Sequence, residues 1–145
     1  MQKITPFLWF DNQAEEAAQF YIAIFKNSKL TSVSPMMVTF ELEGQPFMAL
    51  NGGPTFRFSE AISLFVSCET QPEVDELWDK LSAGGSTSRC GWLKDKYGLS
   101  WQIIPKTLGE LMGDPNPGKS GRVMQAMLQM TKIDIAALQS AYDQQ

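Results

Sequence analysis

The residues best suited to chemistry lie together in the segment CGWLKDKY, where Cys90 is followed by Lys94 and Lys96. A cysteine acts as a nucleophile in its thiolate form, which normally needs an activating base or a neighbouring positive charge. The chain has no histidine to serve as that base, and Asp95 between the two lysines favours their protonated form. We therefore expect Cys90 to have a structural role.

The absence of histidine limits other enzyme chemistry as well, because histidine is the commonest metal ligand and the usual proton carrier near neutral pH. Glu15 and Glu16 are neighbouring carboxylates that could act as an acid and a base. They fall on the polar side of an expected helix, beside its start, where solvation and the helix dipole account for them. We expect both to be solvated surface residues.

Composition and charge exclude several classes of protein. The 145 residues are 43% hydrophobic and 19% charged, which is typical of one folded globular domain. The net charge of -4, without a cluster of Lys or Arg, argues against nucleic-acid and membrane partners. The N-terminal segment has neither the pattern of a signal peptide nor the length of a membrane-spanning helix. We expect a cytoplasmic protein in which Cys68 and Cys90 are reduced thiols.

The elements that must position these residues begin with a strand and a helix. Residues 4–10 form an apolar run of strand length. The apolar residues from Ala14 to Phe25 have the spacing of one helix face, and we expect Asn12 and Glu15 to cap that helix. Residues 38–42 then alternate between apolar and polar side chains, which predicts further strands.

A second strand and helix follow in the same order, with a strand at residues 62–66 and a helix that starts at Thr70. The order of elements predicts an α+β fold with two βαβββ modules, at residues 1–53 and 61–105, inside a single domain of residues 1–145. After a turn cluster at residues 114–118, a methionine-rich helix pair ends a helical tail of residues 107–145. This pair could close a binding site, clasp a partner subunit or simply pack against its own sheet.

Four segments carry a resemblance to a known family: ITPFLWFDNQAEEAAQFY, FMALNGGPTFRFSEAISLFV, CGWLKDKYGLSWQIIP and, in the tail, RVMQAMLQMTKIDIAAL. They resemble the PhnB-like proteins, often labelled demethylubiquinone methyltransferase-like, of the vicinal oxygen chelate superfamily, which includes glyoxalase and bleomycin-resistance proteins. The resemblance implies that the paired βαβββ modules form a curved mixed sheet with the shape of a cup. It also implies a homodimer.

The resemblance further implies a divalent metal held by His and Glu from the first and last strands of each module. The matching places in this chain are Thr5, Ala61, Gln102 and a residue near Asn51. The family's closing pattern of Asp, Gly and Glu matches Asp95, Gly98 and Gln102, so an amide replaces the glutamate. No matching place supplies an imidazole or a carboxylate, and we therefore expect no metal and no other cofactor.

The cup that the resemblance implies would have aromatic walls and a few polar groups, by two-residue alternation along its strands. The expected ligand-binding residues are Thr5, Phe7, Trp9, Asn51, Ser63, Phe65, Ser100 and Gln102. Trp101 and Ile103 should point the other way and pack against a helix. Such walls suit a flat or aromatic small molecule, although the same aromatic side chains could instead fill the core.

Two functions remain open. One is a binding protein for a small apolar or aromatic molecule in a metal-free cup. The other is an enzyme, such as a lyase, an isomerase or a ring-modifying enzyme, which would use a weakly held oxygen-ligated metal or the polar groups of Gln102, Ser100 and Asn51. Methyl transfer fits less well, because neither Gly52-Gly53 nor Gly84-Gly85 forms a glycine-rich turn between a strand and a helix.

One departure from the family lies at Ser34–Met36, where related chains have a Gly- and Pro-rich loop of about a dozen residues. Either that loop has been deleted, or a mobile segment of the natural chain is missing from this sequence. We favour the second explanation, because loops of this composition are commonly mobile.

Overall fold

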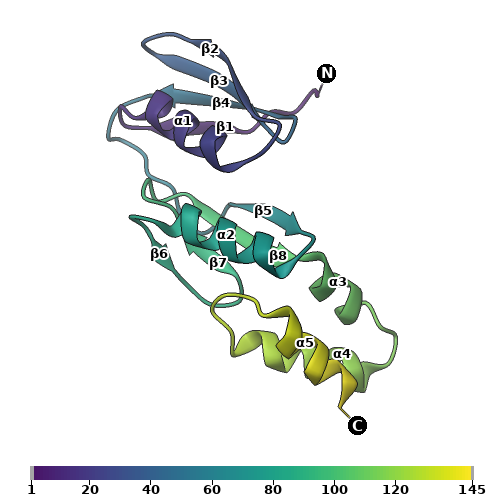
Figure 1. Cartoon of the computed structure of the whole chain (residues 1–145). Coiled ribbons are helices and arrows are strands. Elements are labelled where there is room, and N and C mark those ends of the chain that lie inside the picture. Colours follow the sequence, from purple (N-terminus) through teal and green to yellow (C-terminus); the bar gives the residue numbers. More distant parts are fainter. Residues whose placement is uncertain (1, 145) are drawn as a thin grey trace. The chain divides into compact units, whose positions relative to one another are not determined.

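The computed structural model describes residues 2–144 and divides into two compact units, Met1–Phe58 and Ser59–Gln145 (Figure 1). Each unit contains a four-stranded mixed sheet and a helix in the order βαβββ, and three more helices follow in the second unit. The mixed α+β fold with paired βαβββ modules is therefore confirmed.

Unit 1 contains β1 (Phe7–Phe10), α1 (Ala14–Ile24), β2 (Lys29–Val33), β3 (Met37–Leu42) and β4 (Gln45–Asn51). The strand order is β1-β4-β3-β2, with β1 parallel to β4 and the other pairs antiparallel. The first strand is shorter than the apolar run of residues 4–10.

The core of unit 1 lies between α1 and one face of this sheet. The helix buries Ala14, Ala17, Ala18 and Tyr21, the stripe that the spacing predicts, and its small side chains allow a close approach. In β3 the alternating residues Val38, Phe40 and Leu42 are buried below it, so the strand pattern is confirmed as well.

The expected cap of α1 by Asn12 is wrong. Gln13 occupies the N-cap position and makes no capping hydrogen bond with its side chain. The backbone N–H of Ala14 instead donates to Oδ1 of Asn51, 2.8 Å away at the end of β4. A residue distant in sequence thus satisfies the free donor of the first turn.

The connection between β2 and β3 forms a tight hairpin. The backbone N–H of Ser34 donates to the carbonyl of Met37 at 2.8 Å, and the N–H of Met37 donates to Oγ of Ser34 at 3.1 Å. The short Ser34–Met36 segment is therefore able to join the two strands directly.

Unit 2 contains β5 (Ser63–Cys68), α2 (Gln71–Ser82), β6 (Ser86–Thr87), β7 (Trp92–Lys94) and β8 (Ser100–Pro105), in the strand order β5-β8-β7-β6. Thr70 caps α2 as predicted, since its Oγ1 accepts from the N–H of Glu73 at 3.3 Å. Trp101 and Ile103 are buried, which confirms their expected role in packing.

The tail contains α3 (Lys106–Met112), α4 (Pro117–Leu128) and α5 (Ile135–Asp143), so one further helix precedes the two at the positions of the expected pair. The turn cluster is also shorter than expected, because Pro117 and Gly118 already belong to α4. Asn116 caps this helix by accepting from the N–H of Gly118 at 2.9 Å, and proline fits the first helical position.

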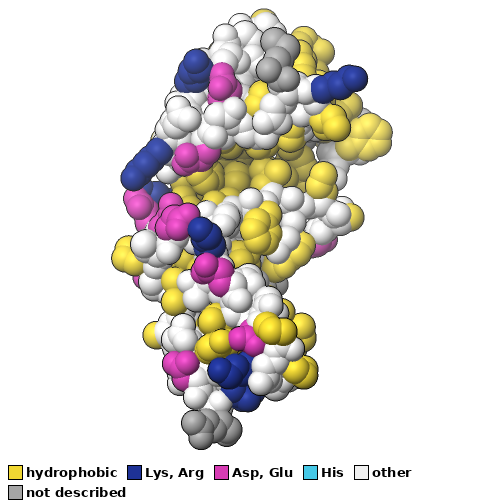
Figure 2. Space-filling view, turned by 90° about the vertical axis from the view of Figure 1, so that its right-hand side faces the viewer, with side chains coloured by type: hydrophobic (Ala, Val, Ile, Leu, Met, Phe, Trp, Pro, Cys, Tyr) yellow, Lys and Arg dark blue, Asp and Glu magenta, His cyan; other side chains and the backbone are white. Residues whose placement is uncertain are grey.

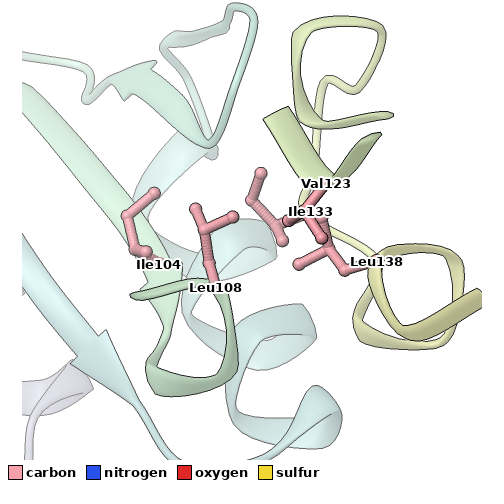
Figure 3. Packing of buried hydrophobic residues seen from close by; sticks show 5 residues of the cluster. All are labelled: Ile104, Leu108, Val123, Ile133 and Leu138. Atoms are coloured by element: carbon pink, nitrogen blue, oxygen red, sulfur yellow. The ribbon is translucent and has the colours of Figure 1, made fainter. Parts of the chain in front are cut away.

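The tail packs against the sheet of its own unit. Its core contains Ile104 at the end of β8, together with Leu108, Val123, Ile133 and Leu138, whose side chains point toward one another (Figure 3). The expected stripe of α4 is only partly buried, since Met124 and Leu128 are 44% and 42% exposed.

Candidate functional site

Each sheet has one face that lies away from its helix, and these open faces carry most of the expected site residues. In β1 of unit 1, Leu8 and Phe10 are buried, whereas Phe7 is 52% exposed and Trp9 is half-buried. The strand register places Phe7 beside Met48 and Trp9 beside Leu50. The open face of unit 1 is therefore aromatic and apolar.

Trp9 is held in a fixed position on this face. Its Nε1 donates to the carbonyl of Gly53 at 2.9 Å, and the ring of Phe56 meets it edge to face with a centroid distance of 4.9 Å. A Cβ atom at Gly52 would lie 2.4 Å from the indole ring, so only glycine fits there. Packing and turn formation thus account for this pair of glycines, as the sequence predicts.

Gly84 and Gly85 have similar structural roles. Gly84 follows α2 with a φ of +77°, in the left-handed region that favours glycine. A Cβ atom at Gly85 would lie 2.1 Å from the carbonyl oxygen of Lys94. Both glycine pairs are therefore explained without a bound cofactor.

Two of the expected site residues do not lie on the open strand face with Phe7 and Trp9. Asn51 pairs with Phe10 in the register, on the helix side of the sheet, and its amide is engaged at both ends. Oδ1 accepts from Ala14, and Nδ2 donates to the carbonyl of Pro35 at 3.0 Å. Thr5 is half-buried and precedes β1 without belonging to a strand.

Sequence analysis missed a cluster of hydroxyl groups in unit 1. Oγ1 of Thr39 lies 2.6 Å from Oγ1 of Thr31 and 2.7 Å from Oγ of Ser32. The register of β2 shifts between Leu30 and Ser32, as in a β-bulge, which allows neighbouring residues to approach the same partner. No local pattern in the sequence marks this shift.

The open face of unit 2 brings four expected site residues together in two rows. In the first row, Ser100 of β8 pairs with Ser63 of β5 on one side and with Lys94 of β7 on the other. In the second, Gln102 lies between Phe65 and Trp92. Partners across a sheet share a face, so these side chains line one surface.

Hydrogen bonding connects the two rows, since Nε2 of Gln102 donates to Oγ of Ser63 at 2.9 Å. Phe65 is 61% exposed, whereas Ser100 is only 1% exposed. The hydroxyl of Ser100 is buried and has no hydrogen-bond partner within residues 2–144. Such a group is costly, and it marks a place where a ligand could supply the missing partner.

A charged pair borders the same face. Nζ of Lys94 forms an ion pair with the carboxylate of Glu60, and their side chains are 42% and 63% exposed. The hydrogen bond from Lys94 lowers the pKa of Glu60. The sequence analysis indicated neither Lys94 nor Glu60 as part of this face.

The residues at the family's metal places do not fit a tightly held transition metal. Thr5 and Gln102 carry neutral oxygen donors, and the amide of Gln102 already bonds Ser63. Across residues 2–144, no three Cys, Asp or Glu side chains gather where an ion could bind.

The matching Asp95 and Gly98 form a turn. The Asp95 carboxylate is buried and accepts from the N–H groups of Tyr97 and Leu99, at 2.9 and 3.1 Å, and from Nε1 of Trp101 at 2.9 Å. Gly98 has a φ of +87° in this turn.

The two cysteines are free thiols, as expected. Burial raises the pKa of Cys68 to about 12, with a smaller contribution from the charge of Glu73. Sγ of Cys90 lies 3.6 Å from the carbonyl oxygen of Met127, and its backbone N–H donates to Met130 at 2.9 Å. These contacts attach the tail to the segment before β7 in the same unit and support a structural role for Cys90.

Comparison with known proteins identifies the family. The family model described as 3-demethylubiquinone-9 3-methyltransferase matches residues 2–104. The chain belongs to this PhnB-like family. A PhnB protein from Bacillus cereus is 38% identical over 72% of this chain and 99% of its own, with a TM-score of 0.69. No curated protein matches the chain.

More distant structures share the fold of the vicinal oxygen chelate superfamily. The fosfomycin resistance protein FosX from Listeria monocytogenes is 16% identical, with a TM-score of 0.56 over 76% of this chain and 97% of its own. A glyoxylase/bleomycin resistance protein/dioxygenase domain from Frankia is 16% identical, with a TM-score of 0.51 over 72% of this chain and 92% of its own.

The tail lies outside the family match. The match to the family model ends at residue 104. The alignment with the Bacillus cereus protein includes 99% of that protein but only 72% of this chain. Helices α3, α4 and α5 are therefore additional to the part that defines the family, and the tail segment adds nothing to that match. No helix among residues 2–144 is both long and apolar enough to cross a membrane.

Proposed function

We propose that the chain is a small-molecule binding protein of the vicinal oxygen chelate superfamily, with a metal-free site for an apolar or aromatic ligand on its open sheet faces. The observation that supports this function is the exposure of Phe7 and Phe65, at 52% and 61%. Large apolar side chains at a surface commonly mark a binding site. Figure 2 shows hydrophobic side chains gathered at the surface, with most of the charged groups to one side of them.

The chemistry of both faces favours a flat ligand with limited polarity. Aromatic walls contribute area and ring contacts, while a few fixed polar groups orient the bound molecule. Trp9 in unit 1 and Phe65 in unit 2 supply such walls, and the Gln102–Ser63 pair supplies an amide and a hydroxyl.

The remaining features of the proposal concern assembly and location. The chain acts as a homodimer of single glyoxalase-like domains in the cytoplasm, without nucleic-acid or membrane partners. The net charge of -4 supports the exclusion of polyanionic partners. We do not propose the methyl transfer in the family's description, because packing and turns account for both glycine pairs.

Calorimetric titration with 2-naphthalenemethanol, before and after dialysis against EDTA, tests this function. We expect binding that EDTA leaves unchanged and that Phe65→Ala weakens about tenfold, the factor for loss of an aromatic contact of roughly 1.5 kcal/mol. Met124→Ala is the matched control, because Met124 is an exposed apolar residue of the tail. No measurable binding, or binding that EDTA abolishes, would contradict the proposal.

A further inference from the structure

We infer that the open face of unit 2 binds a small aromatic carboxylate, with the carboxylate on Lys94 and Ser100 and the ring against Phe65 and Trp92. This inference rests on the proposed function and adds the charge of the ligand and the orientation in which it binds. Three observations support it: the strand register, the ion pair that Lys94 already forms with a carboxylate of this chain, and the buried hydroxyl of Ser100, which has no partner among residues 2–144.

The internal carboxylate belongs to Glu60, three residues before β5. Strand β8 lies between β7 and β5 in the sheet, and the ion pair joins Lys94 of β7 to the segment that leads into β5. Ser100 is the residue of β8 that pairs with Lys94 on one side, and on the other it pairs with Ser63, the first residue of β5. The ion pair with Glu60 thus shows that Lys94 binds a carboxylate at this edge of the face.

A ligand carboxylate can replace Glu60 at little cost. Both partners of the pair are partly exposed, at 42% and 63%, and ion pairs of this kind contribute little to stability. The Lys94 ammonium has three donors on a flexible stem, which can turn toward an incoming anion. An incoming anion can therefore displace the Glu60 carboxylate from Lys94.

Ser100 supplies the reason why a ligand can bind better than Glu60. The hydroxyl of Ser100 is buried without a partner in the described part of the chain, so the Glu60 carboxylate leaves it unsatisfied. A ligand carboxylate has two oxygens, of which one can accept from Lys94 and the other from Ser100. Satisfying a buried donor recovers free energy that the ligand-free protein lacks.

The second row of side chains gives the ring its place. Phe65, Gln102 and Trp92 lie two residues along their strands from Ser63, Ser100 and Lys94, a separation of about 7 Å. This is roughly the length of an aromatic ring that carries a carboxylate. The row is aromatic at both ends, with the Gln102 amide between them, so a flat ring can lie across it.

Calorimetric titrations with 2-naphthoate and with neutral 2-naphthalenemethanol test the inference on the full chain. We expect naphthoate to bind about tenfold more tightly, with a preference that declines as salt is added. Lys94→Met should remove this preference and leave the affinity for the alcohol unchanged. Ser100→Ala should weaken naphthoate alone, about three- to fivefold.

Glu60→Gln gives the most specific result, because it removes the competing carboxylate. Naphthoate should then bind more tightly, by up to about fivefold, which is the contribution of an exposed ion pair. The exposed pair between Glu76 and Lys80 on α2 provides matched controls, and Glu76→Gln and Lys80→Met should leave both affinities unchanged.

Equal affinities for the two molecules, or a Glu60→Gln variant that binds naphthoate no better, would overturn the inference while the proposed apolar site stands. If neither molecule binds, the proposed function and this inference both fail.

Discussion

The side-chain oxygen of Asn51 lies 2.8 Å from the backbone nitrogen of Ala14, so the last residue of β4 caps the first turn of α1. The other end of the same amide donates to the carbonyl of Pro35, beside the β2–β3 hairpin. One side chain therefore connects the helix start, a central strand and a turn.

Replacement of Asn51 by alanine should lower the free energy of unfolding by about 1–2 kcal/mol, because the helix loses its cap and Pro35 loses a donor. Asn51→Asp keeps an acceptor for Ala14 but no donor for Pro35, and should lose roughly half as much. Urea denaturation measures both. Asn12→Ala is the control, since Asn12 lies beside the helix without capping it, and a larger loss in that variant would contradict the assignment.

A second prediction concerns the buried carboxylate of Asp95. Asp95→Ala removes the acceptor of three hydrogen bonds, including that of the Trp101 indole, and should reduce the free energy of unfolding by about 2–4 kcal/mol. Trp101→Phe should cost less, and the double variant less than the sum, because both changes break the same bond. Chemical denaturation of the four proteins provides this cycle, and strict additivity would argue against the bond.

The fold was predictable wherever a local pattern specifies local structure. The stripe of α1, the alternation in β3 and the Thr70 cap of α2 each depend on residues within one element. The cap by Asn51 was not predictable, because it depends on two segments that only the sheet brings together. The early start of α4 at Pro117 also differed, because a proline that marks a turn is equally suited to open a helix.

In the candidate site, too, local patterns were predictable and contacts between distant segments were not. Alternation placed Ser63 and Phe65 on one face of β5, and Ser100 and Gln102 on one face of β8. The approach of Glu60 to Lys94 depends on the strand order of the sheet, which no spacing in the sequence specifies.

A third prediction tests the packing of Trp9. Gly52→Ala would place a methyl group 2.4 Å from the present position of the indole, so the ring must leave Gly53 and Phe56. We expect a red-shifted tryptophan emission as the ring enters water, and weaker binding of 2-naphthalenemethanol. Gly121→Ala is the control, because a Cβ atom there meets nothing within 4 Å. It should leave the emission unchanged and stabilise α4 by about 0.5–1 kcal/mol.

A fourth prediction uses the difference between the two thiols. Because the pKa of Cys68 is raised to about 12, its thiolate is scarce in the folded protein even at pH 9.5, and its burial excludes reagents. Iodoacetamide should therefore modify half-buried Cys90 first and Cys68 only after unfolding, as mass spectrometry of the peptides would show. Rapid modification of Cys68 in the folded chain would contradict this order.

The last prediction is that the tail forms one cooperative unit with the second sheet, although it lies outside the family match. Ile133 is fully buried in the tail core, and a Cβ atom at Gly91 would lie 3.1 Å from its Cγ1. The backbone N–H of Gly91 donates to the carbonyl oxygen of Thr131 at 2.8 Å, and the carbonyl oxygen of Gly91 accepts from the N–H of Ile103 in β8 at 2.8 Å. Packing in the tail should thus stabilise the sheet hydrogen bonds.

Ile133→Ala should lower the free energy of unfolding by about 2–4 kcal/mol, the usual cost of a large-to-small core substitution. It should also speed amide hydrogen exchange at Ile103 in the sheet, because the loss of tail packing reaches β8 through Gly91. Met124→Ala, at an exposed position of α4, should change neither quantity. If Ile133→Ala speeds exchange in α3–α5 alone, the tail unfolds independently of the sheet that it covers.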